Sequence, residues 1–155
     1  MDRRQVLAQY LQDHHVMTLA TNGAGGPWAA AVFYANEGPD FYFLSAPHTR
    51  HSADLAQDPR VAATIQEDCN SWLLIKGVQM SGSVEKLEGE VRDHARRQYD
   101  LKFAGILDAA TAPDRIARAL QGIGWYRLRA ERIRFVDNSQ GFGHKDEWTA
   151  AKMFA

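Results

Sequence analysis

The sequence contains a single cysteine, Cys69, among its 155 residues. One thiol excludes an intrachain disulfide and a zinc finger built on cysteines, and we interpret Cys69 as a structural or loop thiol. No apolar run approaches the ~20 residues that a membrane-spanning helix needs. The polar start Met1–Gln5 leads into a helical pattern and does not resemble a signal peptide. We therefore expect a cytoplasmic protein that does not enter a membrane.

The sequence also has no excess of positive or negative charge. Lys and Arg number 18 and Asp and Glu number 19, which gives a formal net charge of -1 at pH 7. A chain without surplus positive charge has no global attraction to phosphate backbones, so a nucleic-acid partner is not predicted. The composition, 45% hydrophobic and 24% charged, is ordinary for a globular protein. The length suits one domain over residues 1–155.

The familiar signatures of side-chain catalysis and metal binding are absent too. There is no G-x-S-x-G elbow, and the glycine clusters at 23–26 and 141–143 form neither a dinucleotide fingerprint nor a P-loop. No pair of histidines has H-x-x-x-H spacing with a third ligand nearby, so no metal site is predicted; the six are His14, His15, His48, His51, His94 and His144. The sequence names no catalytic residue.

Short strands separated by turn residues dominate what is present. Apolar spacing predicts helices over residues 3–14, 49–57 and 90–103, with another starting near Pro113. Strands are predicted over residues 16–21, 28–36, 41–45, 61–65, 72–75, 78–87, 125–128 and 133–136, and residues 138–155 form a C-terminal tail. This pattern indicates a mainly β (α+β) protein, a small antiparallel barrel of roughly six to seven strands with flanking helices.

The junction at residues 45–52 is the most informative segment. It lies where a strand ends and a helix begins, and the free amides of a helix start attract anions. Its polar side chains suit a phosphate monoester: Ser45, His48, Thr49, Arg50, His51 and Ser52. The alternative is an ordinary capped helix with solvated polar residues, and the residues alone leave both interpretations open.

Two further segments can accommodate a flat ligand. In Lys76–Gln79 a glycine allows close backbone approach, and Gln79 offers a donor and an acceptor to a heteroaromatic edge. The alternative there is a strand bulge with an outward lysine. In Trp28–Tyr34 small side chains in mid-strand leave room on one sheet face for a planar ring. The alternative is tight core packing.

Several of these blocks, taken in order, resemble a known family. They are Val16–Thr21 with its glycine turn, Phe41–Ser45 through His51, Leu55–Val61, and Tyr126–Asp137. Together they are similar to the split-barrel flavin-binding proteins of the pyridoxamine 5'-phosphate oxidase-like superfamily. Lys76–Gln79 and Asp137–Gly143 further resemble its YhbP-like subgroup. The likeness covers most of the chain.

The resemblance implies an FMN-binding split β-barrel that forms a homodimer, with the flavin in a cleft shared by two chains. It implies that Ser45, Thr49 and Arg50 hold the flavin phosphate, with His51 where lysine is usual. A neutral imidazole holds a phosphate less firmly than an ammonium group. Ala31, Val32 and Phe33 would lie beside the ring and Gln79 near the phosphate or the ring edge. Trp148 or Phe142 would reach the partner's flavin.

The resemblance leaves three functions open. The favoured one is an FMN-dependent oxidoreductase acting on an unidentified small molecule, with the cofactor doing the chemistry. Oxidation of vitamin B6 phosphates is not expected, because Arg127-Leu128-Arg129 lacks the histidine of the family's C-terminal Arg-x-His element. The second is the same cleft holding heme or a deazaflavin. The third is a non-enzymatic binding or stress module, which the replacement by His51 would favour.

Overall fold

Alternation of apolar and polar residues builds most of this protein. The computed structural model describes residues 1–104 and 114–155. In the strand β5 (Arg60–Gln66), Val61, Ala63 and Ile65 are buried while every residue between them is exposed. This period of two places one face of a strand against a core and leaves the other face free. The strands β1, β6 and β7 repeat the pattern, so the sheet acquires an inner and an outer face.

Eight strands and five α-helices are described. The strands are β1 (Val16–Gly23), β2 (Gly26–Phe33), β3 (Ala35–Glu37), β4 (Asp40–Ser45), β5, β6 (Lys76–Leu87), β7 (Gly124–Asp137) and β8 (Lys145–Thr149). The α-helices are α1 (Arg3–Asp13), α2 (Arg50–Gln57), α3 (Gly89–Phe103), α4 (Asp114–Gln121) and α5 (Ala150–Met153). Two short 3-10 helices, η1 (Trp72–Leu74) and η2 (Asn138–Gln140), join strands at one end of the molecule.

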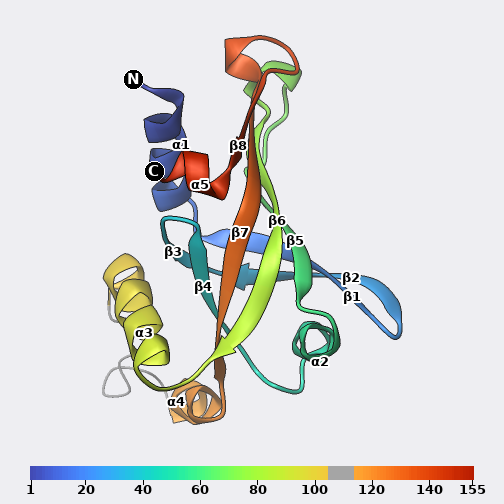
Figure 1. Ribbon diagram of the computed structural model, residues 1–155, viewed down its shortest axis with the longest axis vertical. Coiled ribbons are helices and arrows are strands. Elements are labelled where there is room, and N and C mark those ends of the chain that lie inside the picture. Colours follow the sequence, from blue (N-terminus) through green and yellow to red (C-terminus); the bar gives the residue numbers. More distant parts are fainter. Residues whose placement is uncertain (105–113) are drawn as a thin grey trace.

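All strand pairs are antiparallel, and the sheet order is β2-β1-β5-β6-β7-β4-β3 with β8 added to β7. The two longest strands, β6 and β7, run side by side along the molecule (Figure 1). The first half of β7 pairs with β4 and the second half with β8. Among the described residues, no pairing joins β2 to β3, so the sheet stays open. This confirms the predicted fold class, a split antiparallel barrel with flanking helices.

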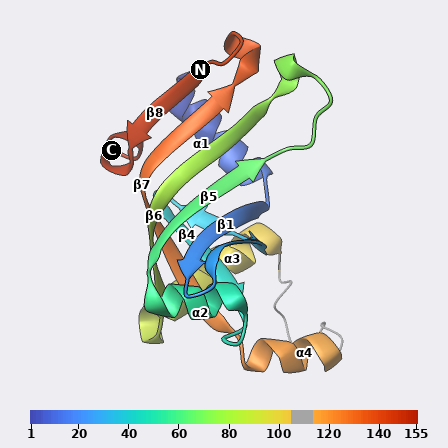
Figure 2. The same cartoon turned by 90° about the vertical axis from the view of Figure 1, so that its right-hand side faces the viewer.

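The inner face of the sheet holds the main core. Leu7, Tyr10 and Leu11 of α1 pack against inward residues such as Met17 and Phe135. A smaller cluster lies between α3 and the β4 end of the sheet, around Tyr99 and Trp125. In Figure 2 the strands β1, β5, β6, β7 and β8 face the viewer and α1 lies behind them. The outer face of these strands is therefore the side turned away from the core.

Some predicted elements were wrong in detail. The run Trp72–Ile75 is not a strand: Ser71 Oγ accepts from the amide of Leu73 at 3.4 Å and starts the 3-10 helix η1. The two predicted strands at residues 125–128 and 133–136 are one strand, β7, because β6 pairs with it along its length. The tail contains β8 and α5, which raises the strand count to eight. Pro113 lies outside the described residues.

Candidate functional site

The junction between β4 and α2 is a closed network of hydroxyl groups. Thr49 Oγ1 donates to Ser52 Oγ at 2.8 Å, and Ser52 Oγ donates to Ser45 Oγ at 3.0 Å. The Ser45 and Thr49 hydroxyls lie 3.1 Å apart, and Nε2 of His51 lies 2.5 Å from Ser45 Oγ. Thr49 is also the N-cap of α2, since its side chain accepts from the Ser52 amide. The structure thus brings together three of the predicted phosphate ligands.

His51 is buried in this network, and among the described residues no carboxylate contacts it. Burial lowers the pKa of its imidazole, and the more distant charge of Asp54 raises the pKa by less. The imidazole is therefore neutral at pH 7. Asp54 itself accepts a hydrogen bond from Thr21 at 2.9 Å, which ties α2 to β1. The junction consequently carries one fixed cation, Arg50.

Arg50 points away from the hydroxyl network, toward the β1–β2 hairpin. Its guanidinium carbon lies 4.2 Å from the centre of the Trp28 ring, and Nη2 donates to the Gly25 carbonyl at 3.1 Å. This cation–π contact holds the side chain over the hairpin. Both Arg50 and Trp28 remain exposed, so the guanidinium keeps donors available to solvent or to an anion.

The outer face of the sheet carries two rows of exposed or half-buried residues. Strand register sets one row across six strands: Ala31, Thr18, Thr64, Gln79, Arg134 and Glu147. The next row consists of Ala29, Ala20, Ala62, Ser81, Arg132 and Thr149. On β2, β1 and β5 these residues are alanine or threonine, while on β6, β7 and β8 all are polar and three are charged: Arg132, Arg134 and Glu147. The outer face therefore has small side chains over β1, β2 and β5 and polar side chains over β6, β7 and β8.

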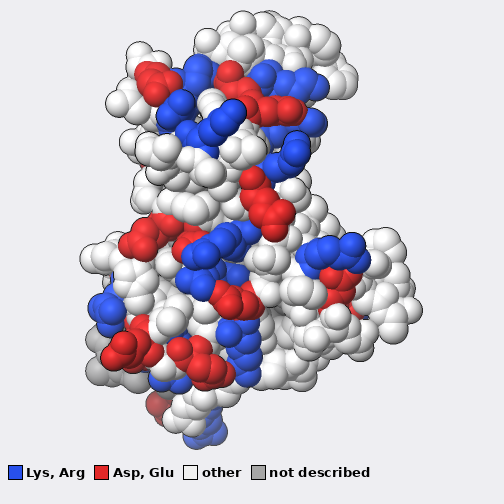
Figure 3. Space-filling view, in the orientation of Figure 1, with Lys and Arg blue, Asp and Glu red and all other residues white. Residues whose placement is uncertain are grey.

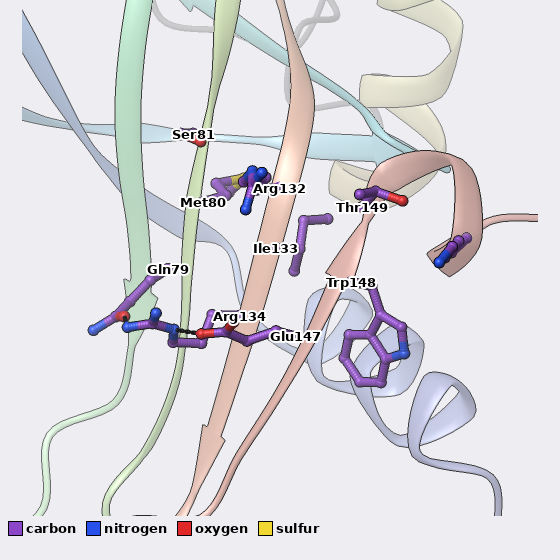
Figure 4. Close-up of a pocket in the computed structure, with 10 residues that line it drawn as sticks. Gln79, Met80, Ser81, Arg132, Ile133, Arg134, Glu147, Trp148 and Thr149 are labelled. Atoms are coloured by element: carbon purple, nitrogen blue, oxygen red, sulfur yellow. Dashed lines mark hydrogen bonds and ion pairs between the residues drawn. The ribbon is translucent and has the colours of Figure 1, made fainter.

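A pocket of about 460 Å³ lies on the polar side, between β6, β7, β8 and α5 (Figure 4). Its polar wall comes from Gln79, Ser81, Arg132, Arg134, Glu147, Thr149 and Lys152. Arg134 pairs with Glu147 and donates weakly to Gln79 at 3.4 Å. Within the described part of the chain, neither Arg132 nor Lys152 has a carboxylate within ion-pair distance, so both remain available to an anionic ligand.

The remaining predicted site residues do not all share this face. Ala31 and Phe33 are exposed on it, but Val32 is half-buried and packs against the main core. Trp148 packs against the core next to Ile133 in the β7–β8 register, and it also lines the pocket. Ala31 and Gln79 are three strand spacings of about 4.8 Å apart, or roughly 14 Å. The backbone at Gly77 lies close to the neighbouring strand β5 and not to open space for a ligand. A Cβ at Gly77 would lie 2.9 Å from the Ile65 carbonyl oxygen.

Sequence reasoning missed the charged wall of the pocket. Arg132 and Arg134 lie in a segment predicted as strand, and their alternation with Ile133 was the signal that both face outward. Glu147 and Lys152 lie in the tail, where β8 and α5 were not predicted. Among residues 1–104 and 114–155, no helix is long and apolar enough to cross a bilayer, and no group of three His, Cys, Asp or Glu side chains could hold a metal ion.

Residues 4–137 match a family model described as pyridoxamine 5'-phosphate oxidase. Two curated relatives match almost the whole chain. A UPF0306 protein of Enterobacter sp. (strain 638) is 34% identical over 98% of this chain and 100% of its own length. The UPF0306 protein YhbP of Escherichia fergusonii is 33% identical over 96% of this chain and 94% of its own length. These relatives bear out the likeness to the YhbP-like subgroup.

A solved structure supports the same fold. The heme binding protein from Mycobacterium smegmatis superimposes with a TM-score of 0.72 and 25% sequence identity. The match covers 97% of this chain and 57% of that one, so the present chain spans little more than half of the larger protein. The shared part is the split barrel itself.

Proposed function

The chain belongs to the pyridoxamine 5'-phosphate oxidase family and, within it, to the UPF0306 proteins, and from this membership we propose that it is an FMN-binding oxidoreductase acting on a small molecule. The outer face of the sheet is the observation that carries the proposal. Alanines and threonines on β1, β2 and β5 allow a flat ring to approach the backbone, and donors and cations on β6 and β7 lie beside them. Bound FMN would supply the transfer of hydride or electrons.

The phosphate of FMN is assigned to the junction. Hydroxyl protons rotate freely, so Ser45 and Thr49 can redirect theirs from the internal network to a phosphate oxygen. Arg50 would supply the positive charge by turning from the Trp28 ring toward the phosphate, and the start of the eight-residue helix α2 adds its partial positive charge. His51 is neutral and contributes a hydrogen bond without a charge. We therefore expect weak phosphate binding, with FMN dissociating at micromolar concentrations.

The ring system is assigned to Ala31 and Phe33, with Val32 supporting β2 from the core side. Gln79 can bond the polar edge of a flavin, because its amide both donates and accepts. Trp148 packs inward in the single chain, so its part in the proposal is to support the wall formed by β8. We place the cofactor in a cleft of a homodimer, because Gln79 and Ala31 of one chain are too far apart to touch one ring. The exposed Cys69 suits a reducing cytoplasm.

Flavin titration tests the proposal. We expect quenching of FMN fluorescence with micromolar affinity, and at least tenfold weaker binding of riboflavin, which lacks the phosphate. Arg50→Gln should weaken FMN binding about tenfold, since a charge-assisted contact is lost. Arg60→Gln is the matched control, because Arg60 is exposed and pairs with Asp58 at the other end of α2. His51→Lys should strengthen FMN binding. Saturating FMN without any change in fluorescence would overturn the proposal.

Heme is the second candidate, favoured by the likeness to the Mycobacterium smegmatis protein. Arg132 and Lys152 in the pocket could hold the propionates of a heme. No histidine lines that pocket, so an axial ligand would come from outside it. Titration with hemin separates the two cofactors. A sharp Soret band at one equivalent, together with no response to FMN, would assign the cleft to heme and would also suit a non-enzymatic binding protein.

A further inference from the structure

Two side chains of α2, one helical turn apart, hold the β1–β2 hairpin against the helix. Asp54 accepts a hydrogen bond from Thr21 at 2.9 Å, and the guanidinium carbon of Arg50 lies 4.2 Å from the centre of the Trp28 ring. Thr21 and Trp28 are register partners on β1 and β2, so the two contacts meet the hairpin at the same level. Positions four apart on a helix share a face, which is why both side chains reach the hairpin.

The two contacts differ in burial. Asp54 and Thr21 are buried, and the backbone packs so closely there that a Cβ at Gly23 would overlap Asp54 Oδ1. Trp28 is 43% exposed, and Arg50 is exposed as well. A cation–π contact at such an exposed position is weak, because water competes for the cation. The Asp54 contact therefore fixes the hairpin on α2, and the Arg50 contact can open while the first one stays in place.

The hairpin offers Arg50 no negative charge. Residues 16–33 contain no Asp, Glu, Lys or Arg, and the outermost part of the hairpin, at the right of Figure 3, is white. Arg50 Nη2 donates to the Gly25 carbonyl at 3.1 Å, and among residues 1–104 and 114–155 no carboxylate lies within ion-pair distance of the guanidinium. Its partners are therefore a ring face and a carbonyl, both neutral. A phosphate binds a guanidinium more strongly than either of them, because both groups are charged.

Gly25 allows the guanidinium to lie against the turn of the hairpin. A Cβ at Gly25 would lie 2.9 Å from Arg50 Nη2 and 3.4 Å from its Cζ, so a larger residue would push the guanidinium away from the turn. Gly25 is not among the glycines with a positive φ, so the backbone of the turn does not itself require glycine at this position. The missing side chain at Gly25 therefore serves the contact with Arg50.

We propose that Trp28 is a positioning residue of the phosphate site. It holds Arg50 away from the hydroxyl groups of Ser45 and Thr49 until a phosphate group draws the guanidinium off the ring. This inference rests on the proposed function, which assigns the FMN phosphate to those hydroxyl groups and to Arg50. The guanidinium exchanges two neutral partners for one anion, and the Trp28 ring and the Gly25 carbonyl are released in the same step.

The exchange makes phosphate affinity depend on the hairpin. The contacts of Arg50 with Trp28 and Gly25 must open before the guanidinium reaches a phosphate, so the observed affinity is reduced by the fraction of molecules in which they are open. The exchange also links the phosphate to the ring of the flavin. Trp28 lies on β2, the strand whose Ala31 and Phe33 the proposed function places beside that ring. Phosphate binding therefore removes one of the two attachments of the strand that supports the ring.

Flavin titration of variants tests the exchange. Trp28→Leu removes the competing ring and should strengthen FMN binding about threefold, the effect of one exposed cation–π contact. Gly25→Ala, which displaces the guanidinium from the turn, should strengthen FMN binding as well. Neither variant should change the affinity for riboflavin, which lacks the phosphate. Trp72→Leu is the matched control, because Trp72 is an exposed tryptophan on η1, away from α2 (Figure 2). Unchanged or weaker FMN binding by Trp28→Leu, or an equal gain for riboflavin, would overturn the proposal.

A double-mutant cycle shows whether Trp28 acts through Arg50. In an Arg50→Gln background the ring has no cation to hold, so adding Trp28→Leu should leave the FMN affinity of Arg50→Gln unchanged. A merely structural effect of Trp28 on the hairpin would change the affinity by the same factor in both backgrounds. That result would contradict the assignment of Trp28 as a positioning residue.

Inorganic phosphate provides a test without flavin. Indole N–H signals of isotope-labelled protein are recorded by NMR while sodium phosphate replaces sodium chloride at constant ionic strength and pH 7. The Trp28 signal, identified by its loss in Trp28→Leu, should shift as Arg50 leaves the ring, whereas the Trp72 signal should stay; in Arg50→Gln neither should move. A shift of Trp28 with phosphate in a protein that does not bind FMN would support the inference and refute the proposed function. FMN binding that is equally strong in wild type and Trp28→Leu would do the reverse. A Trp28 signal that responds to neither phosphate nor FMN would overturn the inference.

Discussion

The Nε2 atom of His51 lies 2.5 Å from the hydroxyl oxygen of Ser45, in the connection between the end of β4 and the first turn of α2. This contact places an imidazole where a lysine would carry a permanent charge. It also closes the hydroxyl network, since Thr49 and Ser52 contact the same serine. Protonation of the His51 imidazole therefore affects both the stability of the junction and its affinity for an anion.

Acid should destabilise the protein through His51. Burial lowers the pKa of the folded imidazole below its usual value near 6.5, so the unfolded chain binds more protons at pH 5.5. Stability is therefore lost as the pH falls through and below 6.5. His51→Gln should reduce this loss, measured by urea unfolding at pH 7.5 and pH 5.5. The exposed His48→Gln is the control. Equal losses in wild type and His51→Gln would contradict the expectation.

Lys102 should make the free energy of unfolding depend on pH in the alkaline range. Its Nζ donates to the carbonyls of Leu11 at 2.9 Å and His14 at 2.6 Å, and it lies 3.9 Å from the Tyr34 ring centre. Burial lowers the pKa of Lys102 to about 8, below the unfolded value near 10.4. Between these values the unfolded chain binds more protons, so this contribution to stability rises with pH.

Replacing this lysine tests both contacts and charge. Lys102→Met should cost about 1–3 kcal/mol at pH 7, because two carbonyls lose a charged donor. The difference in unfolding free energy between wild type and Lys102→Met should grow from pH 7.5 to pH 9.5, measured in parallel urea series. Lys86→Met, at an exposed position on β6, is the control. A difference that stays constant over this range would show that burial does not perturb the ammonium group.

Gly82 should not tolerate any side chain. It lies at the irregularity between Ser81 and Gly82, where β6 shifts register against β7. A Cβ at Gly82 would lie 2.1 Å from the Arg129 carbonyl oxygen, which is backbone and cannot swing aside. Gly82→Ala should therefore destabilise the protein by about 3 kcal/mol, as overpacking does. Gly122→Ala meets no described atom within 4 Å and should have a small effect. Similar midpoints in urea for the two variants would refute this.

The strands that could be predicted are those whose signal is local. In β5 the buried residues Val61, Ala63 and Ile65 alternate with exposed neighbours, so the sequence marks the strand within about a residue. β8 has no such signal, because Lys145–Thr149 is mostly charged and becomes a strand through pairing with β7. The run Trp72–Leu74 led to the opposite error, because a strand was predicted where the chain forms the 3-10 helix η1. Its apolar composition is typical of a buried strand, but nothing in the sequence says that its side chains stay in solvent.

In the candidate site, too, contacts between residues near in sequence could be predicted, and contacts between distant strands could not. Ser45, Thr49 and His51 lie within seven positions of one another, so a turn into a helix suffices to bring them together, and their proximity could be predicted. The rows on the outer face depend on register between distant strands. A shift of one residue would turn each row to the core. The roughly 14 Å between Ala31 and Gln79, and the cations Arg132 and Lys152 near the latter, could therefore not be predicted.

Asn138 should control the order of the two loops that carry the exposed rings of Trp72 and Phe142 without controlling the fold. Asn138→Ala removes the bonds to the Trp72 carbonyl and the Gly143 amide, which join the two loops. We expect exchange of the Gly143 amide hydrogen to accelerate at least tenfold, because local opening no longer breaks that bond. Amides of β5 should be unaffected. Ser139→Ala is the matched control, since its hydroxyl donates to Asp137 within the same loop. Unchanged exchange at Gly143 in Asn138→Ala would contradict the prediction.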